Sequence, residues 1–476
     1  MREFLADGGA EATPIRFARP GGWKQGLKGL AASLRFAEAY GFDASAGKTL
    51  LLPDVKGEIA LVLVGLGKGD EIDPLLPGKL SSALPKGVYQ FEDWPGDPEL
   101  AVIAFLLGAY RFERYRKRSA EAARLVLPDG VDRARILRIA ESVALGRDLI
   151  NMPANDMGPV ELAAAAQALA TRHKAKCAIT IGDELLKANF PMIHAVGRGS
   201  ARAPRLVDIQ FGKSSDPKVT LVGKGVVFDT GGLDIKPPAG MLMMKKDMGG
   251  AATALAAASM IMDARLPVRL RVLLPIVENA IGGDSFRPGD VLKSRKGLTV
   301  EIGNTDAEGR LILADALALA DEESPELLID FATLTGAARV ALGPDLPPFF
   351  TRSDKLAAQI SQIGDRLADP VWRLPLWRPY HALFDSKIAD MNNVSSSPFA
   401  GSVIAALFLG RFVEKAREWA HFDIFGWTPS TKNGRPEGAE PQTARLVYAL
   451  VEEKFSANIT GQAAQGKGLR RARRTQ

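Results

Sequence analysis

Two stretches of this chain set charged residues among glycines and apolar residues, a pattern that a solvated surface does not need. Residues 222–250 read VGKGVVFDTGGLDIKPPAGMLMMKKDMGG, and residues 301–311 read EIGNTDAEGRL. The charged residues of interest are Lys224, Asp229, Lys236, Asp247, Asp306, Glu308 and Arg310. Because an unpaired ion is costly to bury, the fold must bring these charges together or supply counter-ions for them.

Divalent cations would allow these charges to be buried together. Four of the residues are acids whose charges two divalent ions would balance: Asp229, Asp247, Asp306 and Glu308. Buried carboxylates without counter-ions raise one another's pKa and disrupt packing. The alternative is that these acids cap helices and pair with lysines on a surface. We favour a metal site, because glycines and β-branched residues flank each acid.

The predicted helices and strands place these residues at one crevice. Residues 218–223 read as a buried strand that ends just before Lys224, and Asp229 ends the next apolar stretch. Residues 249–262 predict a helix of small residues, and residues 310–323 predict a second helix with Arg310 in its first turn. Strand carboxyl ends beside helix amino termini form the usual active-site crevice of an open α/β sheet.

These motifs resemble those of the leucyl aminopeptidase family, the cytosolic dinuclear-metal exopeptidases of peptidase family M17. NTDAEGRL, residues 304–311, matches the family's signature octapeptide throughout, and GKGVVFDTGG, LDIK and KKDMGGAA match the upstream motifs in order and spacing. Val227, Thr230 and Leu242 replace commoner residues, and none falls on a ligand position. Further similarity in GRDLINMPANDMGP, AVGRGSARAPRL, DFATLTGAARVALG and WAHFDIFG covers most of residues 146–427.

The resemblance implies that each subunit binds two divalent metal ions, Mn²⁺ or Zn²⁺. Asp229 and Glu308 would bridge the two ions, and Asp306 would complete the more exchangeable site. Lys224 and Asp247 would complete the tighter one. A lysine can ligate only as the neutral amine, so the pKa of Lys224 must fall far below the usual value of about 10.4.

The resemblance also implies a mechanism and a substrate pocket. A water or hydroxide that bridges the ions would attack the scissile carbonyl and release the N-terminal residue of a peptide. Lys236 would stabilise the oxyanion, and Arg310 would hold a bicarbonate ion that moves the proton to the leaving amine. The residues of the substrate pocket would be Met244, Thr333, Leu334 and Gly336. Such an apolar pocket would favour leucine-like side chains, and the less favoured alternative is that Met244 fills a gap in the core.

The alternation of predicted helices and strands indicates a two-domain α/β protein. We expect a smaller N-terminal α/β domain and a larger C-terminal α/β catalytic domain with a central mixed sheet flanked by helices. In the N-terminal part, residues 48–53 and 58–67 predict strands, and residues 22–42 and 99–117 predict helices. The predicted divisions are residues 1–132 for the N-terminal domain, 133–151 for a linker helix, 152–457 for the catalytic domain and 458–476 for a basic, disordered tail.

The net charge of +6 raises the question of nucleic-acid binding. Most of this charge lies in the tail, on Lys467, Arg470, Arg471, Arg473 and Arg474. The rest of the chain is nearly neutral, so a solubilising tail is the simpler interpretation. Binding of nucleic acid or another acidic partner through this tail is the alternative function. Another dinuclear metal hydrolase, acting on phosphoesters, is a further alternative; the lysine ligand and the lack of an Arg-rich phosphate clamp argue against it.

Other features favour a cytoplasmic protein that does not bind membranes, and the resemblance implies peptide substrates. The chain lacks a run of about 18 apolar residues, and its N-terminus lacks the apolar segment of a secretory signal. A single cysteine, Cys177, fits a reducing compartment. The resemblance implies a homohexamer of two trimers. The histidines lie outside the site motifs, so none is an obvious general base, and His421 is expected in a buried strand.

Overall fold

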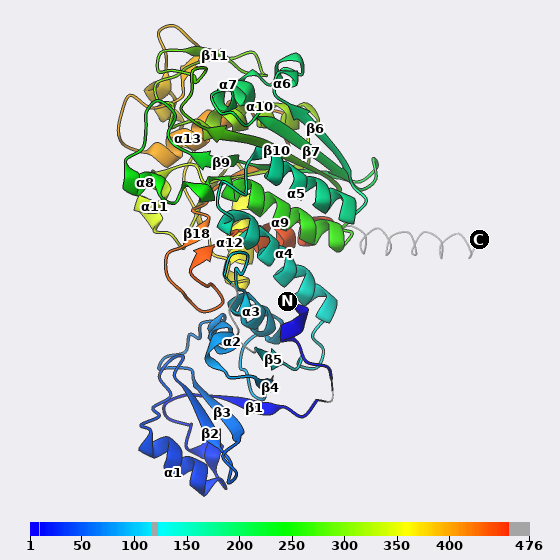
Figure 1. The fold of residues 1–476 in the computed structure, drawn as a ribbon, viewed down its shortest axis with the longest axis vertical. Helices are drawn as coiled ribbons and strands as arrows, with labels where there is room; N and C mark the ends of the chain where they lie inside the picture. Colours follow the sequence, from blue (N-terminus) through cyan, green and yellow to red (C-terminus); the bar gives the residue numbers. More distant parts are fainter. Residues whose placement is uncertain (9, 117–121, 457–476) are drawn as a thin grey trace, which may run out of the picture. The chain divides into compact units, whose positions relative to one another are not determined.

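The computed structural model describes residues 1–8, 10–116 and 122–456 (Figure 1). The basic tail predicted over residues 458–476 lies outside the described residues. The chain forms two compact units, one of residues 1–144 with 430–437 and one of residues 145–429 with 438 onwards. The boundary falls inside helix α4 (Arg133–Asn151), which has the bounds predicted for the linker helix.

The first unit is built on a mixed five-stranded sheet with the order β2-β3-β1-β4-β5. Strand β2 is antiparallel to β3, and the other neighbours are parallel. The strands are β1 (Thr13–Ala18), β2 (Thr49–Pro53), β3 (Ile59–Gly65), β4 (Gly87–Phe91) and β5 (Ala123–Leu125). The helices are α1 (Ala31–Ala39), α2 (Leu80–Ala83) and α3 (Pro98–Ala109), with short 3₁₀ turns η1 (Arg2–Phe4), η2 (Gln25–Leu27) and η3 (Leu76–Lys79).

Both helices predicted in this unit are shorter than the sequence pattern suggests. The pattern over residues 22–42 is divided into η2 and α1 by Gly29, whose φ of 90° is a left-handed conformation that favours glycine. The pattern over residues 99–117 yields α3, which ends at Ala109, since Tyr110 has a non-helical ψ of 137°. Residue 117 lies outside the described residues.

The second unit contains a nine-stranded mixed sheet with the order β15-β14-β17-β13-β8-β10-β7-β6, and β9 also pairs with β10. The central strands β17, β13, β8 and β10 run parallel, while β14, β7 and β6 are antiparallel to their inner neighbours. The strands are β6 (Lys176–Ile181), β7 (Arg205–Phe211), β8 (Lys218–Gly223), β9 (Gly225–Asp229), β10 (Arg269–Asn279), β13 (Leu327–Ala332), β14 (Pro348–Thr351), β15 (Trp372–Arg373) and β17 (Trp419–Asp423). Smaller sheets join β11 (Val291–Lys293), β12 (Thr299–Glu301) and β16 (Met391–Asn392), and β18 (Trp427–Thr428) and β19 (Gly438–Ala439).

Helices cover both faces of this sheet. In Figure 1, α5 and α9 lie on one side of it, and α7, α10 and α13 lie on the other. The helices are α5 (Pro159–Arg172), α6 (Glu184–Lys187), α7 (Pro191–Gly197), α8 (Pro238–Met241), α9 (Gly249–Asp263), α10 (Gly309–Glu322), α11 (Gly336–Leu342), α12 (Asp354–Arg366) and α13 (Gly401–Gly410), with 3₁₀ helices η4 (Met244–Met248) and η5 (Arg378–Phe384). Residues 444–456 are also helical. The predicted two-domain α/β fold, with a central mixed sheet in its larger part, is confirmed.

The apolar core of the second unit lies between the sheet and α7, α10 and α13. Val222 of β8 and Leu273 of β10 are buried there with Leu317 of α10 and Phe408 of α13. Within the described part of the chain, we find no helix of the length and apolarity needed to cross a membrane.

The parallel strands β17, β13 and β8 end at one edge of the sheet, where helix α9 also begins. The close approach of α9 to this edge requires a glycine. A Cβ at Gly250 would stand 2.2 Å from the carbonyl oxygen of Phe331 and 2.8 Å from the amide nitrogen of Lys224. This edge therefore holds Lys224 and the start of α9 in close contact.

Candidate metal centre and substrate pocket

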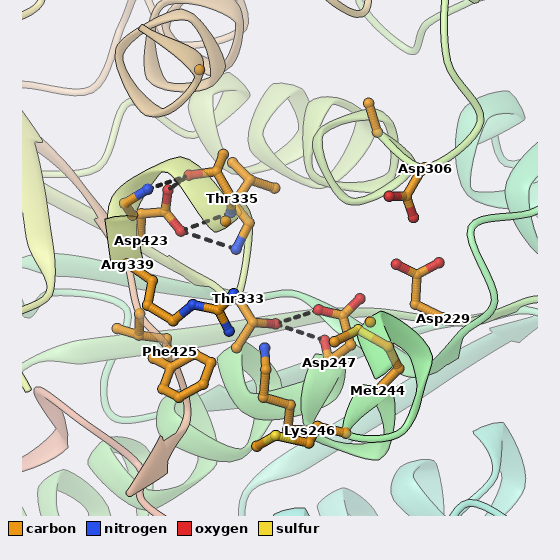
Figure 2. Close-up of a pocket in the computed structure, with 18 of the residues that line it drawn as sticks. Asp229, Met244, Lys246, Asp247, Asp306, Thr333, Thr335, Arg339, Asp423 and Phe425 are labelled. Atoms are coloured by element: carbon orange, nitrogen blue, oxygen red, sulfur yellow. Dashed lines mark hydrogen bonds between the residues drawn. The ribbon is translucent and has the colours of Figure 1, made fainter. Parts of the chain in front are cut away.

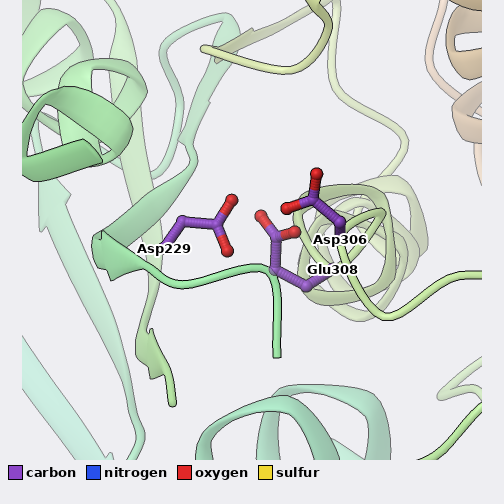
Figure 3. A group of neighbouring side chains, drawn as sticks. All are labelled: Asp229, Asp306 and Glu308. Atoms are coloured by element: carbon purple, nitrogen blue, oxygen red, sulfur yellow. The ribbon is translucent and has the colours of Figure 1, made fainter. Parts of the chain in front are cut away.

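The residues predicted to bind metal come together at this edge of the sheet. Asp229 is the last residue of β9, and Asp306 and Glu308 lie in the loop that enters α10. Figure 3 shows the three carboxylates facing one another. Each offers one carboxylate oxygen, and these oxygens all lie within 4.8 Å of one another. This spacing allows shared cations to bind several of the carboxylates at once.

Lys224 and Asp247 complete the cluster. The Lys224 ammonium lies 2.8 Å from Oδ2 of Asp247 and 3.0 Å from Oε1 of Glu308. It also donates a hydrogen bond of 3.1 Å to the carbonyl of Thr333. All five residues that the sequence predicts as ligands thus lie in one cluster, although they come from segments about eighty residues apart in the chain.

Neighbouring groups fix the orientation of these carboxylates. Oδ1 of Asp229 accepts hydrogen bonds from the amide of Gly231 at 2.9 Å and from Nδ2 of Asn279 at 2.8 Å. Oδ1 of Asp247 accepts one from the hydroxyl of Thr333 at 2.7 Å. Such second contacts orient the side chains that hold a metal. The sequence analysis missed Asn279, because it ends β10 far from either motif and has no signature of its own.

Burial and mutual repulsion make this group of charges unfavourable without cations. Burial, together with the neighbouring Asp229, raises the pKa of Glu308 to about 8 and that of Asp306 to about 6. Both carboxylate oxygens of Glu308 are buried, and neither accepts a hydrogen bond from a described residue. Carboxylate oxygens beside an amine form a donor set that suits divalent cations such as Mn²⁺ or Zn²⁺. The residues present therefore fit a metal centre.

The two lysines of the site balance part of this negative charge. Burial alone would lower the pKa of Lys224, but the carboxylates of Asp247, Glu308 and Asp229 raise it overall. Lys236 behaves in the same way, because its ammonium lies 2.9 Å from Oδ2 of Asp229 and also contacts Asp306. Cations must take over this balancing role before Lys224 can act as a neutral amine.

Arg310 lies in the first turn of α10 and is buried. Its Nη1 donates a hydrogen bond of 2.7 Å to the carbonyl of Asn393. Its Nε is also buried and donates to no described residue. Burial lowers the pKa of Arg310 to about 10, so the guanidinium remains charged near neutral pH. The residue can offer a cationic donor to an anion in the pocket.

A pocket of about 510 Å³ opens beside the cluster (Figure 2). This volume suits a small substrate or the end of a peptide. Every residue that the sequence assigns to the site lines this pocket except Glu308, which is buried next to Lys224. The lining residues from the prediction are Lys224, Asp229, Lys236, Met244, Asp247, Asp306, Arg310, Thr333, Leu334 and Gly336.

Asp423 holds one wall of this pocket and was not assigned from the sequence. Its Oδ1 accepts hydrogen bonds from the amides of Leu334 and Thr335 at 3.0 and 3.1 Å. Its Oδ2 accepts from the hydroxyls of Thr335 at 2.6 Å and Ser402 at 3.0 Å. The loop between β13 and α11, which contains the predicted substrate residues Thr333 and Leu334, is therefore fixed by one buried carboxylate.

Three further pocket residues also escaped the sequence analysis: Lys246, Arg339 and Phe425. The Lys246 ammonium lies 5.0 Å and the Arg339 guanidinium 5.1 Å from the centre of the Phe425 ring. Burial lowers the pKa of Lys246 to about 8. Lys246 belongs to the KKDMGGAA motif, but the motif does not show which of its two lysines is buried in the pocket.

The histidines stand apart from this chemistry. His421 lies in β17, fully buried as predicted, with Nδ1 2.5 Å from Oδ1 of Asp330. Among the described residues, no histidine lines the pocket. Proton transfer in this pocket must therefore depend on groups other than imidazole.

The chain matches two family models. The model described as "Cytosol aminopeptidase family, catalytic domain" matches residues 144–451, and the model described as "M17 aminopeptidase, N-terminal domain" matches residues 13–128. A probable cytosol aminopeptidase of Roseiflexus castenholzii is 41% identical over 366 residues, which cover 73% of this chain and 75% of that protein. A probable cytosol aminopeptidase of Pseudomonas syringae pv. syringae is 40% identical over 440 residues, which cover 85% of this chain and 87% of that protein.

Solved structures give the same result. The crystal structure of a cytosol aminopeptidase from Coxiella burnetii has a TM-score of 0.92 and 47% identity, covering 96% of this chain and 100% of that one. The structure of the bottromycin maturation enzyme BotP in complex with Mn has a TM-score of 0.84 and 33% identity, and the match covers 93% of this chain and 100% of that one. These relatives support neither a nucleic-acid-binding protein nor a phosphoester hydrolase. The chain belongs to the cytosol aminopeptidase family, M17, whose members are metal-dependent aminopeptidases that act on peptides.

Proposed function

We propose that this protein releases N-terminal residues from peptides at the pocket beside Asp229, Asp306 and Glu308, with two divalent cations bound in each subunit. The observation that carries the proposal is the buried cluster of carboxylates, whose charge exceeds what the lysines of the site balance. Manganese and zinc are the candidate ions, and BotP, a related structure, is in complex with Mn.

The resemblance to the family supplies the ligand assignment, and the clustering of these side chains supports it. Asp229 and Glu308, which lie close to Asp306, would bridge the two ions. Asp306 would complete one site, and Lys224 and Asp247, which lie 2.8 Å apart, would complete the other. Bound divalent cations supply Lewis acidity and lower the pKa of a water molecule.

Lys236 would stabilise the negative charge that develops on the carbonyl oxygen of the substrate. The carboxylates of Asp229 and Asp306 raise its pKa, which keeps the ammonium protonated and aimed into the pocket. A fixed cationic donor of this kind acts in the transition state without further reorganisation.

Arg310 would hold a bicarbonate ion, which supplies a base for proton transfer. This proposal is supported by the buried Arg310 guanidinium, whose Nη1 donates a hydrogen bond to the carbonyl of Asn393. Its Nε has no hydrogen-bond partner among the described residues. A charged guanidinium binds planar oxyanions through paired hydrogen bonds. This role accounts for chemistry in a pocket without imidazole.

Substrate would lie along Met244 and the segment Thr333, Leu334 and Gly336. Met244 and Phe425 give the pocket an apolar part, which suits a leucine-like side chain. We also propose that the protein works in the cytoplasm, since its relatives are named cytosol aminopeptidases. A homohexamer of two trimers is our proposal for its assembly, and light scattering on purified protein would measure its mass.

Hydrolysis of leucine p-nitroanilide by chelator-treated protein, before and after addition of Mn²⁺ or Zn²⁺, tests the proposed function. N-acetyl-leucine p-nitroanilide serves as the control substrate, because it lacks the free amino group. We expect cleavage of the free amine only, and only with metal restored. Asp229→Asn should abolish it, whereas Asp354→Asn, at a highly exposed carboxylate, should not. Equal cleavage of both substrates, or activity without metal, would contradict the proposal.

A further inference from the structure

Two cationic side chains enter the substrate pocket without an acidic partner. Lys246 is only 6% exposed, and its ammonium makes no hydrogen bond or ion pair with a described residue. The Arg339 guanidinium, which is exposed at the pocket, likewise forms no ion pair in the described part of the chain. In Figure 2 both lie beside the Phe425 ring and point toward the space next to Thr333.

The nearby acids are already engaged elsewhere. Asp247 contacts Lys224 through Oδ2 and accepts the hydroxyl of Thr333 through Oδ1. Asp423 uses both oxygens on the loop after β13 and on Ser402. Neither carboxylate pairs with Lys246, although Lys246 and Asp247 are neighbours in the chain. Neither cation therefore forms an ion pair with a described residue, and only the longer-range negative charges of Asp247 and Asp423 act on Lys246.

An unbalanced buried ammonium beside a second cation is unfavourable for the protein alone. Natural proteins accept such costs mainly where a ligand offsets them. A carboxylate between the two groups would accept charge-assisted hydrogen bonds from both, which are stronger than neutral ones. The ring of Phe425 and the thioether of Met244 would pack against the methylene groups that carry this carboxylate.

The position of the pair indicates which carboxylate would fit. Lys246 lies two residues from Met244 on the same 3₁₀ helix and directly precedes Asp247, one of the proposed ligands. The side chain of the residue to be released would enter the pocket past Met244. Its end group would then reach the space between Lys246 and Arg339.

We propose that Lys246 and Arg339 form a carboxylate subsite that binds the side chain of an N-terminal glutamate or aspartate. The enzyme would then remove acidic residues from peptides as well as leucine-like ones. This inference rests on the proposed function, because it uses the same pocket and the same metal centre.

Four aminoacyl p-nitroanilides test this subsite: those of glutamate, aspartate, leucine and lysine. The leaving group of all four substrates is p-nitroaniline, which carries no carboxylate, so the substrates differ only in the side chain of the aminoacyl residue. With manganese-loaded enzyme, we expect kcat/KM for glutamate or aspartate within about tenfold of leucine and at least about 100-fold above lysine. Lys246→Met should lower kcat/KM for the acidic substrates by about 10- to 100-fold, because a charged hydrogen bond is lost. For leucine p-nitroanilide, kcat/KM of this variant should stay within about threefold of the wild-type value.

Lys245→Met is the matched control. The Lys245 ammonium donates to the carbonyl of Asn151 at 2.7 Å and lies outside the pocket lining, so its loss should leave the glutamate-to-leucine ratio unchanged. Lys246→Met should fold, because it replaces a buried charge by an apolar side chain of similar length. Arg339→Met should have the smaller effect of the two pocket variants, because solvent already screens this exposed guanidinium.

The possible failures can be told apart. If the loaded enzyme cleaves no p-nitroanilide, the proposed function itself is wrong, and the subsite with it. If it cleaves leucine p-nitroanilide but the glutamate-to-leucine ratio does not change in Lys246→Met, the subsite is overturned and the function stands. If Lys246→Met weakens cleavage of the dipeptide Leu-Leu but not of glutamate p-nitroanilide, the cation binds the C-terminal carboxylate instead, which also overturns the proposal.

Discussion

Lys224 is the residue whose chemistry most restricts the metal centre. We predict that Lys224→Arg lowers kcat/KM by about 100-fold or more, because a guanidinium keeps its proton and has no lone pair for a cation. Space is also short, since a Cβ at Gly309 would already lie 2.5 Å from Cε of Lys224. Metal content by mass spectrometry and leucine p-nitroanilide hydrolysis would be measured together. Lys218→Arg, at the other end of β8, is the control. Normal activity with two ions bound to Lys224→Arg would remove the lysine from the ligand set.

Asn279 is predicted to act through Asp229. It is 1% exposed, and its Nδ2 donates to Oδ1 of Asp229 and to the carbonyl of Thr305. Asn279→Leu should weaken metal affinity by about 10- to 100-fold, because the carboxylate loses a group that orients it. Titration of stripped protein with Mn²⁺, followed by activity, would measure this shift. Unchanged affinity in a well-folded variant would show that the backbone alone orients Asp229.

At this scale, sequence analysis finds residues that carry a motif and misses residues that act through space. Asp229, Asp306 and Glu308 stand in Gly-rich apolar segments, and the structure brings them together as predicted. Asn279 lies outside both segments, and Lys246 lies in the first segment without being assigned a role. The burial of Lys246 depends on the ring of Phe425, which lies far away in the sequence. Contacts of this kind are tertiary, so no local pattern could indicate them.

The packing of α9 against the ends of β8 and β13 is the element contact that most directly supports the site. We predict that Gly250→Ala destabilises the protein by about 1–3 kcal/mol, the usual range for overpacking. The added Cβ would meet backbone atoms of Phe331 and Lys224, which cannot move aside as a flexible side chain could. The midpoint of urea unfolding would measure the effect.

Gly283→Ala is the matched control for this prediction. A Cβ there would meet nothing within 4 Å, so we expect a change within about 0.5 kcal/mol. Equal midpoints for Gly250→Ala and the wild-type protein would mean that α9 can shift away from the sheet. The activity of the variant would then show whether Lys224 depends on that contact.

Element boundaries were predicted well where local residues signal them. Helix α10 begins beside its signature loop, and α4 has its predicted bounds. The start of α3 is marked by Asp97, which caps the helix, and by Pro98 in its first turn. Its end is not marked, because the apolar pattern continues past Ala109. A turn set by backbone conformation, as at Gly29, is equally hard to see in a hydrophobic pattern.

For the whole molecule, alternating helix and strand patterns were enough to predict an α/β protein with a separate N-terminal part. They could not show that residues 430–437 belong to the first unit. In the sequence this segment lies between two segments of the second unit. A division of the chain into consecutive domains therefore assigns it to the wrong unit. The order of the nine strands in the large sheet is likewise set by long-range pairing.

The carboxylate cluster that we propose as the metal centre lies within the second unit, which leads to a prediction about the whole chain. A ligand that binds only the native state stabilises that state by about 2.7 kcal/mol per site when its free concentration is 100 times the dissociation constant. This stabilisation should act on the unit that contains the ligands, because the first unit contributes no carboxylate to the cluster. Mn²⁺ should therefore slow amide hydrogen exchange in peptides that cover residues 222–250 and 301–311. Exchange in residues 13–91 should stay unchanged.

Mass spectrometry of full-length protein, with and without Mn²⁺, would measure this exchange. Asp229→Asn provides the control, because a chain that has lost this proposed bridging carboxylate should show no protection at either segment. Equal protection of the N-terminal strands would mean that cation binding stabilises both units as one cooperative body. Protection confined to the second unit would instead mean that the cations stabilise mainly the elements around the carboxylate cluster, β8, β9 and α10.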